Sequence, residues 1–314
     1  MSRPQPTPAP APLGPPLTDL VGDYLNSCRA RGLSPRTLAT SYGFALEAVF
    51  LPWCAQAGLR TLDDLDQQVL DRFTTDLNAR ISRRGRPLSK ASVHSYVRPV
   101  RQLLTWARGL GETVAGQPQL PRLPHRERQP LSRAEISRLE AAADRARDQL
   151  VLRLFADCGL RLLEVTGLGP ADLRRSGHRT HLCVRGKGDR ERFVPLPPDL
   201  ARRLDRFIRT RPAETPPDRL FAASRRGAQG TYAPLTRSGV AQIVHALGSR
   251  AALDRPVNPH LLRHSWMTQM IRQGMNPIQL RIIGGASEGV IAEHYTHLTA
   301  DDGYDAMLRA LERR

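Results

Sequence analysis

Five side chains along the chain have chemistry suited to handling a phosphate group: Arg161, Lys187, His260, Arg263 and Tyr295. The lysine is unusual, because the chain has 47 Lys and Arg residues and only Lys90 and Lys187 are lysines. Arg does not release its proton near neutral pH, whereas Lys can do so. A sequence that otherwise uses Arg for positive charge has a reason to keep Lys187, and we predict that it transfers a proton.

Arg161 lies in the segment Cys158-Gly-Leu-Arg-Leu-Leu-Glu164, where Gly159 is expected to end one helix before another begins. An Arg at a helix start beside a tight turn can project its guanidinium into a cleft, and its fork suits a bidentate phosphate contact. Glu164, three residues on, is expected to hold nearby backbone or a basic group in place. Taken alone, Arg161 is only weakly indicated as functional, because the alternative is one more solvated arginine among 45.

Lys187 lies in a Gly-Lys-Gly turn between two short β-rich runs, 181–185 and 192–196, which together predict a hairpin. Glycine on both sides lets the backbone approach a ligand closely. An ammonium at such a tip can reach a DNA groove and protonate a departing 5′ oxygen, as a general acid must. The alternative is a solvated turn lysine, which is less persuasive in a chain with so few lysines.

The segment Asn258-Pro-His-Leu-Leu-Arg-His264 predicts a helix start, with Asn258 as the cap and Pro259 at the first position. His260 and Arg263 are three apart and therefore share a face of the first turns, where the helix dipole favours an anion. A phosphate held by both this Arg and the upstream one has its transition-state charge neutralised from two directions. His260 is expected to accept a proton or orient the phosphate, and His264 to be structural.

Tyr295 stands in Glu-His-Tyr-Thr-His, residues 293–297. A phenol titrates near ~10, so a nucleophilic Tyr needs a base and positive charge beside it. The groups above supply both. The alternative is a Tyr that anchors a helix to the core. Tyr304 is the nearby competitor, but its Asp-Asp-Gly-Tyr-Asp setting repels a phosphate.

Composition indicates a polyanionic partner, because the net charge is +17 and the sequence pI is about 11.1. Nucleic acid is the leading candidate. A genome rich in Arg codons explains Arg over Lys but not the excess of positive charge. The four cysteines are widely spaced and predict reduced thiols without a metal-ligand pattern. No transmembrane segment and no signal peptide are expected, which favours the cytoplasm.

The chain is expected to divide into two domains. Residues 1–16 contain seven prolines and predict a disordered tail. Helix signals near Thr18, Ser34, Asp66 and Ser89 predict a four-helix domain over 17–115, followed by a basic Pro-rich linker over 116–130. A capping box at Ser132 opens a second domain, 131–314, which is mostly helical with the small β-hairpin and a final helix over 301–314.

The motifs together resemble the tyrosine recombinase (phage integrase) family, with Xer-like size and layout. The resemblance rests on Gly-Leu-Arg161-x-x-Glu164, the Gly-Lys187-Gly hairpin, His260-x-x-Arg263-His264 and Tyr295-Thr-His297. It implies a mainly α fold, with an N-terminal helical core-binding domain and a mixed α/β catalytic domain that close around duplex DNA.

By this resemblance, Arg161 and Arg263 bind the scissile phosphate, Lys187 is the general acid, His260 assists, and Tyr295 forms a 3′-phosphotyrosyl link. The implied activity is site-specific recombination through a Holliday junction, by a homotetramer or heterotetramer on DNA, without ATP, cofactor or metal. An enzyme of this kind works on the nucleoid in the cytoplasm. Xer-like resolvase, phage integrase and transposon integrase all remain open, as does docking of the C-terminal helix in cis or in trans.

One position departs from the family pattern. A His or Trp usually stands nine residues before the nucleophile, where this chain has Ala286. Loss of one transition-state donor slows cleavage by about ten- to a thousandfold, although Ser287 or a water can substitute. The alternatives are therefore a non-catalytic or cleavage-impaired DNA-binding relative, and an enzyme that relaxes DNA without exchanging strands.

Overall fold

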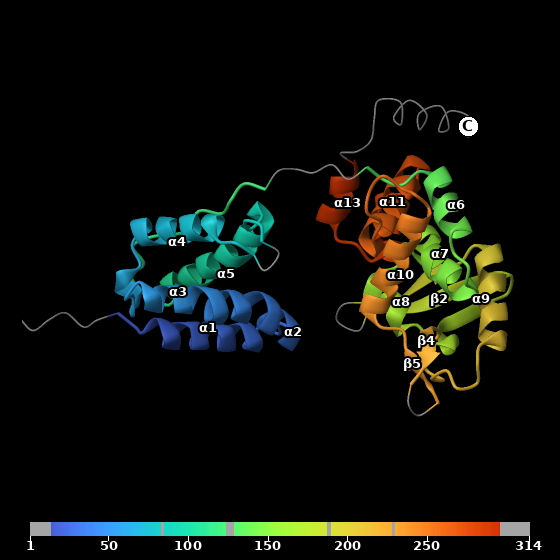
Figure 1. Cartoon of the computed structure of the whole chain (residues 1–314), viewed down its shortest axis with the longest axis horizontal. Helices are drawn as coiled ribbons and strands as arrows, with labels where there is room; N and C mark the ends of the chain where they lie inside the picture. Colours follow the sequence, from blue (N-terminus) through green and yellow to red (C-terminus); the bar gives the residue numbers. More distant parts are fainter. Residues whose placement is uncertain (1–13, 83–84, 124–128, 187–189, 228–229, 296–314) are drawn as a thin grey trace, which may run out of the picture. The chain divides into compact units, whose positions relative to one another are not determined.

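The computed structural model describes residues 14–82, 85–123, 129–186, 190–227 and 230–295, and the side chains of 293–295 are not described. The predicted general acid Lys187, most of the Pro-rich tail and the C-terminal helix over 301–314 lie outside these residues. The chain forms two compact units, residues 1–126 and 127–314 (Figure 1).

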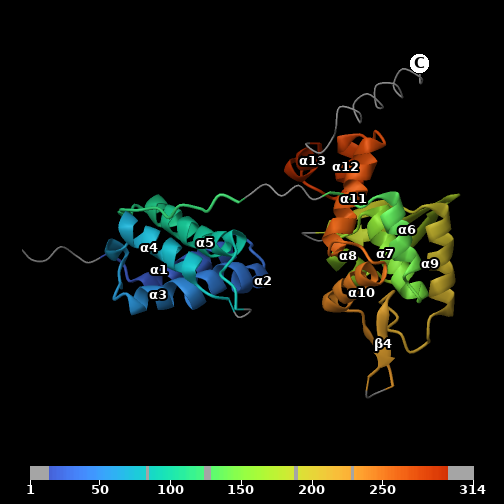
Figure 2. The same ribbon diagram turned by 45° about the horizontal axis from the view of Figure 1, so that its top comes forward.

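The regular elements of the N-terminal unit, as far as its residues are described, are helices, and the first is α1, Leu17–Ala30. A second helical stretch is made of α2 (Pro35–Thr37), the π-helical turns η1 (Leu38–Gly43) and η2 (Leu46–Phe50), and α3 (Leu51–Gln56). The 3₁₀ turn η3 (Leu62–Asp64), α4 (Gln67–Ala79) and α5 (Lys90–Gly109) complete the unit. Figure 2 shows these helices packed around one another.

Local signals account for these helix starts. The Asp66 carboxylate accepts a hydrogen bond from the Val69 amide at 2.8 Å, and the Ser89 hydroxyl accepts one from Ser92 at 3.1 Å. Phe50 and Phe73 meet edge-to-face, with ring centroids 5.1 Å apart, in the centre of the core. The helices of the unit pack together around this apolar core.

The stretch Pro35–Gln56 bears on the expectation that the chain has no transmembrane segment. It is long and apolar enough to cross a membrane by length and composition alone. Its buried residues, among them Leu46, Phe50 and Cys54, belong to the core of the N-terminal unit. Burial in that core explains the apolar composition of the stretch.

The C-terminal unit begins with α6 (Arg133–Ala141), α7 (Ala146–Cys158) and α8 (Leu162–Gly167). After the 3₁₀ turn η4 (Pro170–Asp172), a three-stranded sheet has β1 (Leu173–Ser176), β2 (Arg179–Arg185) and β3 (Glu191–Pro195). Then come α9 (Pro198–Thr210) and a two-stranded sheet, β4 (Ala222–Arg226) with β5 (Tyr232–Pro234). The last elements are α10 (Arg237–Arg250), α11 (Pro259–Arg272), α12 (Pro277–Gly284) and α13 (Glu288–Tyr295).

The predicted fold class, helical with a small hairpin sheet, is confirmed. Strands β2 and β3 are antiparallel, with Val184 opposite Arg192, and β1 adds a third strand that the sequence did not reveal. The predicted capping box of α6 is present, because the Ser132 hydroxyl accepts from the Glu135 amide and the Glu135 carboxylate accepts from the Ser132 amide. Helix α7 is central and packs against α6, α9, α10 and α11.

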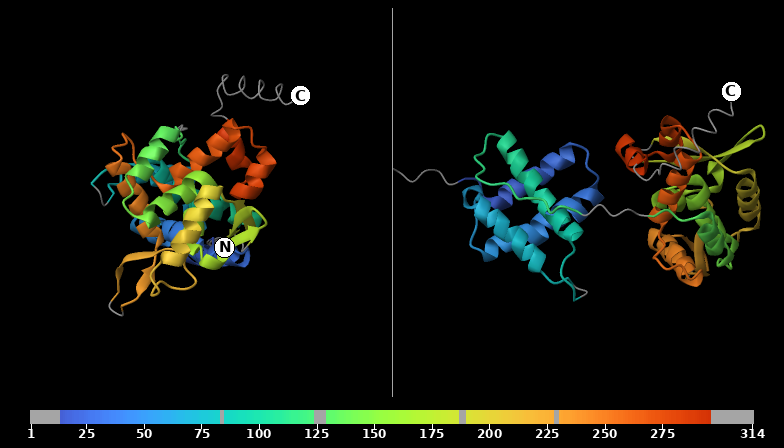
Figure 3. Two further views of the ribbon diagram at one scale, coloured as in Figure 1. Left: turned by 90° about the vertical axis from the view of Figure 1, so that its right-hand side faces the viewer. Right: turned by 90° about the horizontal axis from the view of Figure 1, so that it is seen from above.

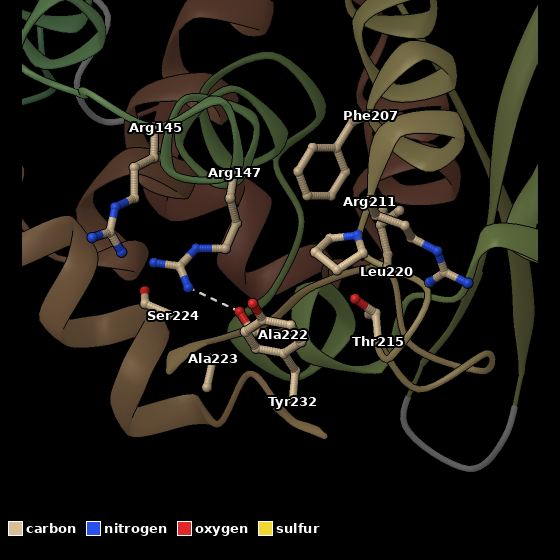
Figure 4. A pocket seen from close by; sticks show the side chains of 11 residues that line it. Arg145, Arg147, Phe207, Arg211, Thr215, Leu220, Ala222, Ala223, Ser224 and Tyr232 are labelled. Carbon is tan, nitrogen blue, oxygen red and sulfur yellow. Dashed lines mark hydrogen bonds between the residues drawn. The ribbon is translucent and has the colours of Figure 1, made fainter. Parts of the chain in front are cut away.

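The β4–β5 ribbon was also missed by the sequence reasoning. It projects from the end of the unit opposite α13 in Figures 1 and 2, and the left view of Figure 3 shows it extending away from the rest of the unit. A cavity of about 170 Å³ lies where this ribbon meets α7 and α9 (Figure 4). Arg147 closes one side of it by donating to the Ala222 carbonyl at 2.8 Å and to Asp148 at 2.8 Å. The bond to Ala222 fastens the ribbon to α7.

Candidate active site

The turn that presents Arg161 depends on a glycine. Helix α7 ends at Gly159, which adopts the left-handed conformation with φ 59°. A Cβ at this position would lie 2.0 Å from Cε3 of Trp266, a buried residue of α11. Both the backbone conformation and the space therefore require Gly. The chain then turns so that Arg161 is the N-cap residue of α8.

The Glu164 carboxylate accepts four hydrogen bonds. Its Oε1 accepts from Nη1 of Arg161 at 2.9 Å and from Nη1 of Arg192 at 2.7 Å. Its Oε2 accepts from the Arg161 amide at 2.7 Å and from Nη2 of Arg192 at 2.8 Å. The structure thus confirms the expectation that Glu164 holds nearby backbone and a basic group.

Glu164 is ionised in spite of its burial. The side chain is 2% exposed, whereas that of Arg161 is 41% exposed. Burial acts to raise the pKa of Glu164, but the hydrogen bonds from Arg192 and from the Arg161 amide outweigh it and hold the pKa below its ordinary value. A buried negative charge therefore lies beneath the more exposed Arg161.

Three arginines donate to three successive carbonyls at the end of α12, those of Ile283, Gly284 and Gly285. Arg192 Nε donates to the first at 2.7 Å, Arg263 Nη2 to the second at 2.6 Å, and Arg161 Nη2 to the third. The last carbonyls of a helix have no partner within the helix, and its negative dipole end favours cations. This row of carbonyls, which we call the α12 carbonyl row, brings Arg161 and Arg263 together.

Arg263 is the most buried of the three arginines. Its Nη1 also donates to the Gly159 carbonyl, so it joins the ends of α7 and α12. Burial, and then the positive charges of Arg161 and Arg192, lower the pKa of Arg263 to about 10. The group remains charged at neutral pH. A cation held this close to other cations is favourable for binding an anion such as phosphate.

His260 and Tyr295 lie on neighbouring helices. The Asn258 side chain caps α11 by accepting from the Leu261 amide at 2.9 Å, as predicted. His260 follows in the first turn and is exposed, whereas Arg263 one turn later is buried. Tyr295 is the last residue of α13, which packs against α11 and α12. The roles of these residues, and of Lys187 between β2 and β3, stay predictions.

Sequence reasoning missed Arg192, which it treated only as part of a strand. Its guanidinium is 11% exposed and makes two bonds to Glu164 and one to Ile283. No local signal marks it, because it is one arginine among many and its partners are distant in sequence. Ala286, the departure from the family pattern, is 6% exposed and packs in a cluster with Trp266 and Ile291.

The part of the chain that the structure describes has no group of three or more His, Cys, Asp or Glu residues placed to hold a metal ion. The four cysteines are free and buried.

Comparison with known proteins identifies the family to which the chain belongs. Residues 129–301 match the model of the phage integrase family. The chain is 29% identical to the tyrosine recombinase XerC of Pelobacter propionicus, over 86% of this chain and 87% of the relative. It is 30% identical to the tyrosine recombinase XerC 2 of Ralstonia nicotianae, over 80% of this chain and 74% of the relative.

Solved structures share the fold. The XerH site-specific recombinase in a post-cleavage complex matches with a TM-score of 0.68 at 19% identity, over 91% of this chain and 83% of that chain. The Tn1549 transposon integrase with transposon right end DNA matches with a TM-score of 0.68 at 20% identity, over 94% and 99%. The match to the family model and the similarity to the two relatives show that the chain belongs to the phage integrase family and is a tyrosine recombinase, as the sequence motifs predicted.

Proposed function

We propose that this protein cuts and rejoins duplex DNA at specific sites through a covalent link between Tyr295 and a 3′ phosphate. The observation that supports this most is the convergence of Arg161 and Arg263 on successive carbonyls of the α12 carbonyl row. The helix that follows this row, α13, ends at Tyr295. In the sequence, the α12 carbonyl row therefore follows Arg161 and Arg263 and precedes Tyr295.

In the proposed reaction, Tyr295 Oη forms a bond to the scissile phosphorus, and the bond from phosphorus to the 5′ oxygen breaks. Lys187 gives the departing oxygen a proton, and His260 accepts the phenol proton or orients the phosphate. Arg161 and Arg263 neutralise the charge that develops on the non-bridging oxygens. A 5′ hydroxyl then attacks the phosphotyrosine in the reverse sense, so the bond energy is kept and no ATP is needed.

The proposed partners are duplex DNA with specific recombination sites and further protomers in a homotetramer or heterotetramer. The net charge of +17 favours DNA, because phosphate neutralisation releases counterions. A lambda integrase tetramer bound to a Holliday junction shares the fold, with a TM-score of 0.66 at 17% identity. This likeness supports strand exchange through such a junction. The proposed place of action is the nucleoid in the cytoplasm.

A second candidate function is DNA binding with impaired or absent cleavage. Ala286 favours it, because an alanine side chain offers no hydrogen-bond donor where the family usually has His or Trp. Ala286 is also buried in the apolar cluster that contains Trp266 and Ile291. Against this candidate, all five predicted catalytic residues are present in the sequence.

The test is to mix purified protein with fragmented host DNA, denature with detergent, and sequence the DNA that stays covalently attached. Recovery of the same short sequence in independent samples is expected, and it reveals the target site. Exchange of strands between two labelled copies of that site then tests recombination. Good binding without covalent DNA would contradict the proposal and favour the second candidate function.

A further inference from the structure

Arg192 connects three elements that the proposed site requires. It lies in β3, its fork grips Glu164 of α8 at 2.7 and 2.8 Å, and its Nε reaches the Ile283 carbonyl of α12 at 2.7 Å. The fork-to-fork geometry fixes direction as well as distance. A side chain held by three bonds and 11% exposed has little freedom to move.

The same guanidinium packs against the segment that Arg161 grips. A Cβ added at Gly285 would lie 3.2 Å from Cζ of Arg192 and 3.0 Å from Nη1 of Arg161. Both arginines therefore pack against Gly285, while both also share the Glu164 carboxylate. The position of Arg161 is thus set by groups that Arg192 holds.

Charge gives Arg192 a second effect on the site. With Arg192 present, Glu164 divides its hydrogen bonds between two guanidiniums, so its charge does not cancel that of Arg161 alone. The group of Arg161, Arg192, Arg263 and Glu164 carries three positive charges and one negative charge. Without Arg192 the carboxylate is left to Arg161, and the excess positive charge falls.

We propose that Arg192 is a positioning residue for phosphate binding, acting through Glu164 and the α12 carbonyl row to set Arg161 and Arg263. The inference rests on the proposed function. Arg192 itself contacts protein groups rather than the reacting atoms. Its partners in the described structure are those that orient Arg161, and this distinguishes its effect from that of the proton donor Lys187.

The experiment compares single-turnover cleavage of the recovered site by Arg192→Met, Lys187→Ala and wild-type protein on three DNAs. One is unmodified, one has a 5′-bridging sulfur that leaves without a proton, and one has a methylphosphonate that removes the charge of a non-bridging oxygen. Arg175→Met is the matched control, since Arg175 lies in β1 of the same sheet and pairs with Asp205 on the surface.

Arg192→Met is expected to cut unmodified DNA about 10- to 100-fold more slowly, as misplaced catalytic groups do. On methylphosphonate DNA its deficit against wild type should shrink to a few fold, because no anionic oxygen then needs the arginines. The sulfur substrate should restore Lys187→Ala but not Arg192→Met. Arg192→Lys should recover only part of the rate, because one ammonium cannot reproduce the fork.

Rescue of Arg192→Met by the sulfur substrate would overturn the proposal, because Arg192 would then act through the proton donor. An equal deficit on all three DNAs would also overturn it, because that is the result of a purely structural role. Circular dichroism and the DNA dissociation constant establish that each variant is folded and bound. A wild type that cuts none of the three DNAs would instead contradict the proposed function itself.

Discussion

Replacing Gly159 by Ala tests how tightly the turn before Arg161 is built. Gly159 combines two constraints, a left-handed backbone with φ 59° and contact with Trp266. Gly177 offers a matched control in the same unit. Its φ is 56°, but no heavy atom lies within 4 Å of an added Cβ. The two substitutions therefore share the backbone strain and differ in the steric overlap.

The expected magnitudes follow from these two terms. A left-handed non-glycine residue costs about 1–2 kcal/mol. Overlap of a new methyl group at 2.0 Å from the Trp266 ring adds overpacking of about 1–3 kcal/mol. Gly159→Ala should therefore lower the free energy of unfolding by about 2–5 kcal/mol, and Gly177→Ala by only about 1–2 kcal/mol.

Hydrogen–deuterium exchange of α7 and α11 in mild denaturant measures this loss within the C-terminal unit. A global unfolding curve is less suitable, because two units need not unfold in one step. In a Trp266→Leu background the excess cost of Gly159→Ala should disappear, which gives a coupling energy of about 1–3 kcal/mol. Equal losses for the two glycines, or no coupling to Trp266, would refute the reasoning.

Three further predictions concern the site. Glu164→Gln should be less stable than wild type by about 3 kcal/mol near pH 7, since it leaves Arg192 buried without its counterion. The folded-state pKa of Glu164 lies below its ordinary value, so this difference in the free energy of unfolding should shrink as the pH falls through the folded pKa. Denaturation curves between pH 7 and 3 measure it, and a constant difference over that range would oppose the prediction. Lys187→Ala should fail to cut ordinary DNA yet cut DNA with a 5′-bridging sulfur, and absence of rescue removes the general-acid assignment. Ala286→His should raise the cleavage rate while lowering stability by about 1–3 kcal/mol, because the position is buried, and an unchanged or lower rate would show that no donor is missing there.

Local signals in the sequence were enough to predict where the principal helices start. Ser89, Ser132 with Glu135, and Asn258 each cap the helix that was expected after them. Gly159 ends α7 in the left-handed conformation that a C-terminal glycine provides. Such signals act within a few residues, so the interacting partners are all close together in the sequence.

The features that the sequence did not reveal depend on distant partners. Arg192 is 28 positions from Glu164 and 91 from Ile283, and nothing in its strand separates it from other arginines. The α12 carbonyl row is a backbone feature, so no side-chain pattern marks it. The burial of Ala286 likewise depends on the packing of α11 against α12 and α13. Tertiary packing, rather than local propensity, decides each of these.

The central claim is that Tyr295 is the nucleophile, and peptide mapping of the covalent complex tests it most directly. The protein is trapped on its recovered site and digested with protease and nuclease, and the peptide that carries the residual 3′ nucleotide is sequenced by mass spectrometry. We expect the nucleotide on Tyr295, its loss in Tyr295→Phe, and its retention in the matched variant Tyr304→Phe. A nucleotide on Tyr304, or a covalent complex that survives Tyr295→Phe, would contradict the account.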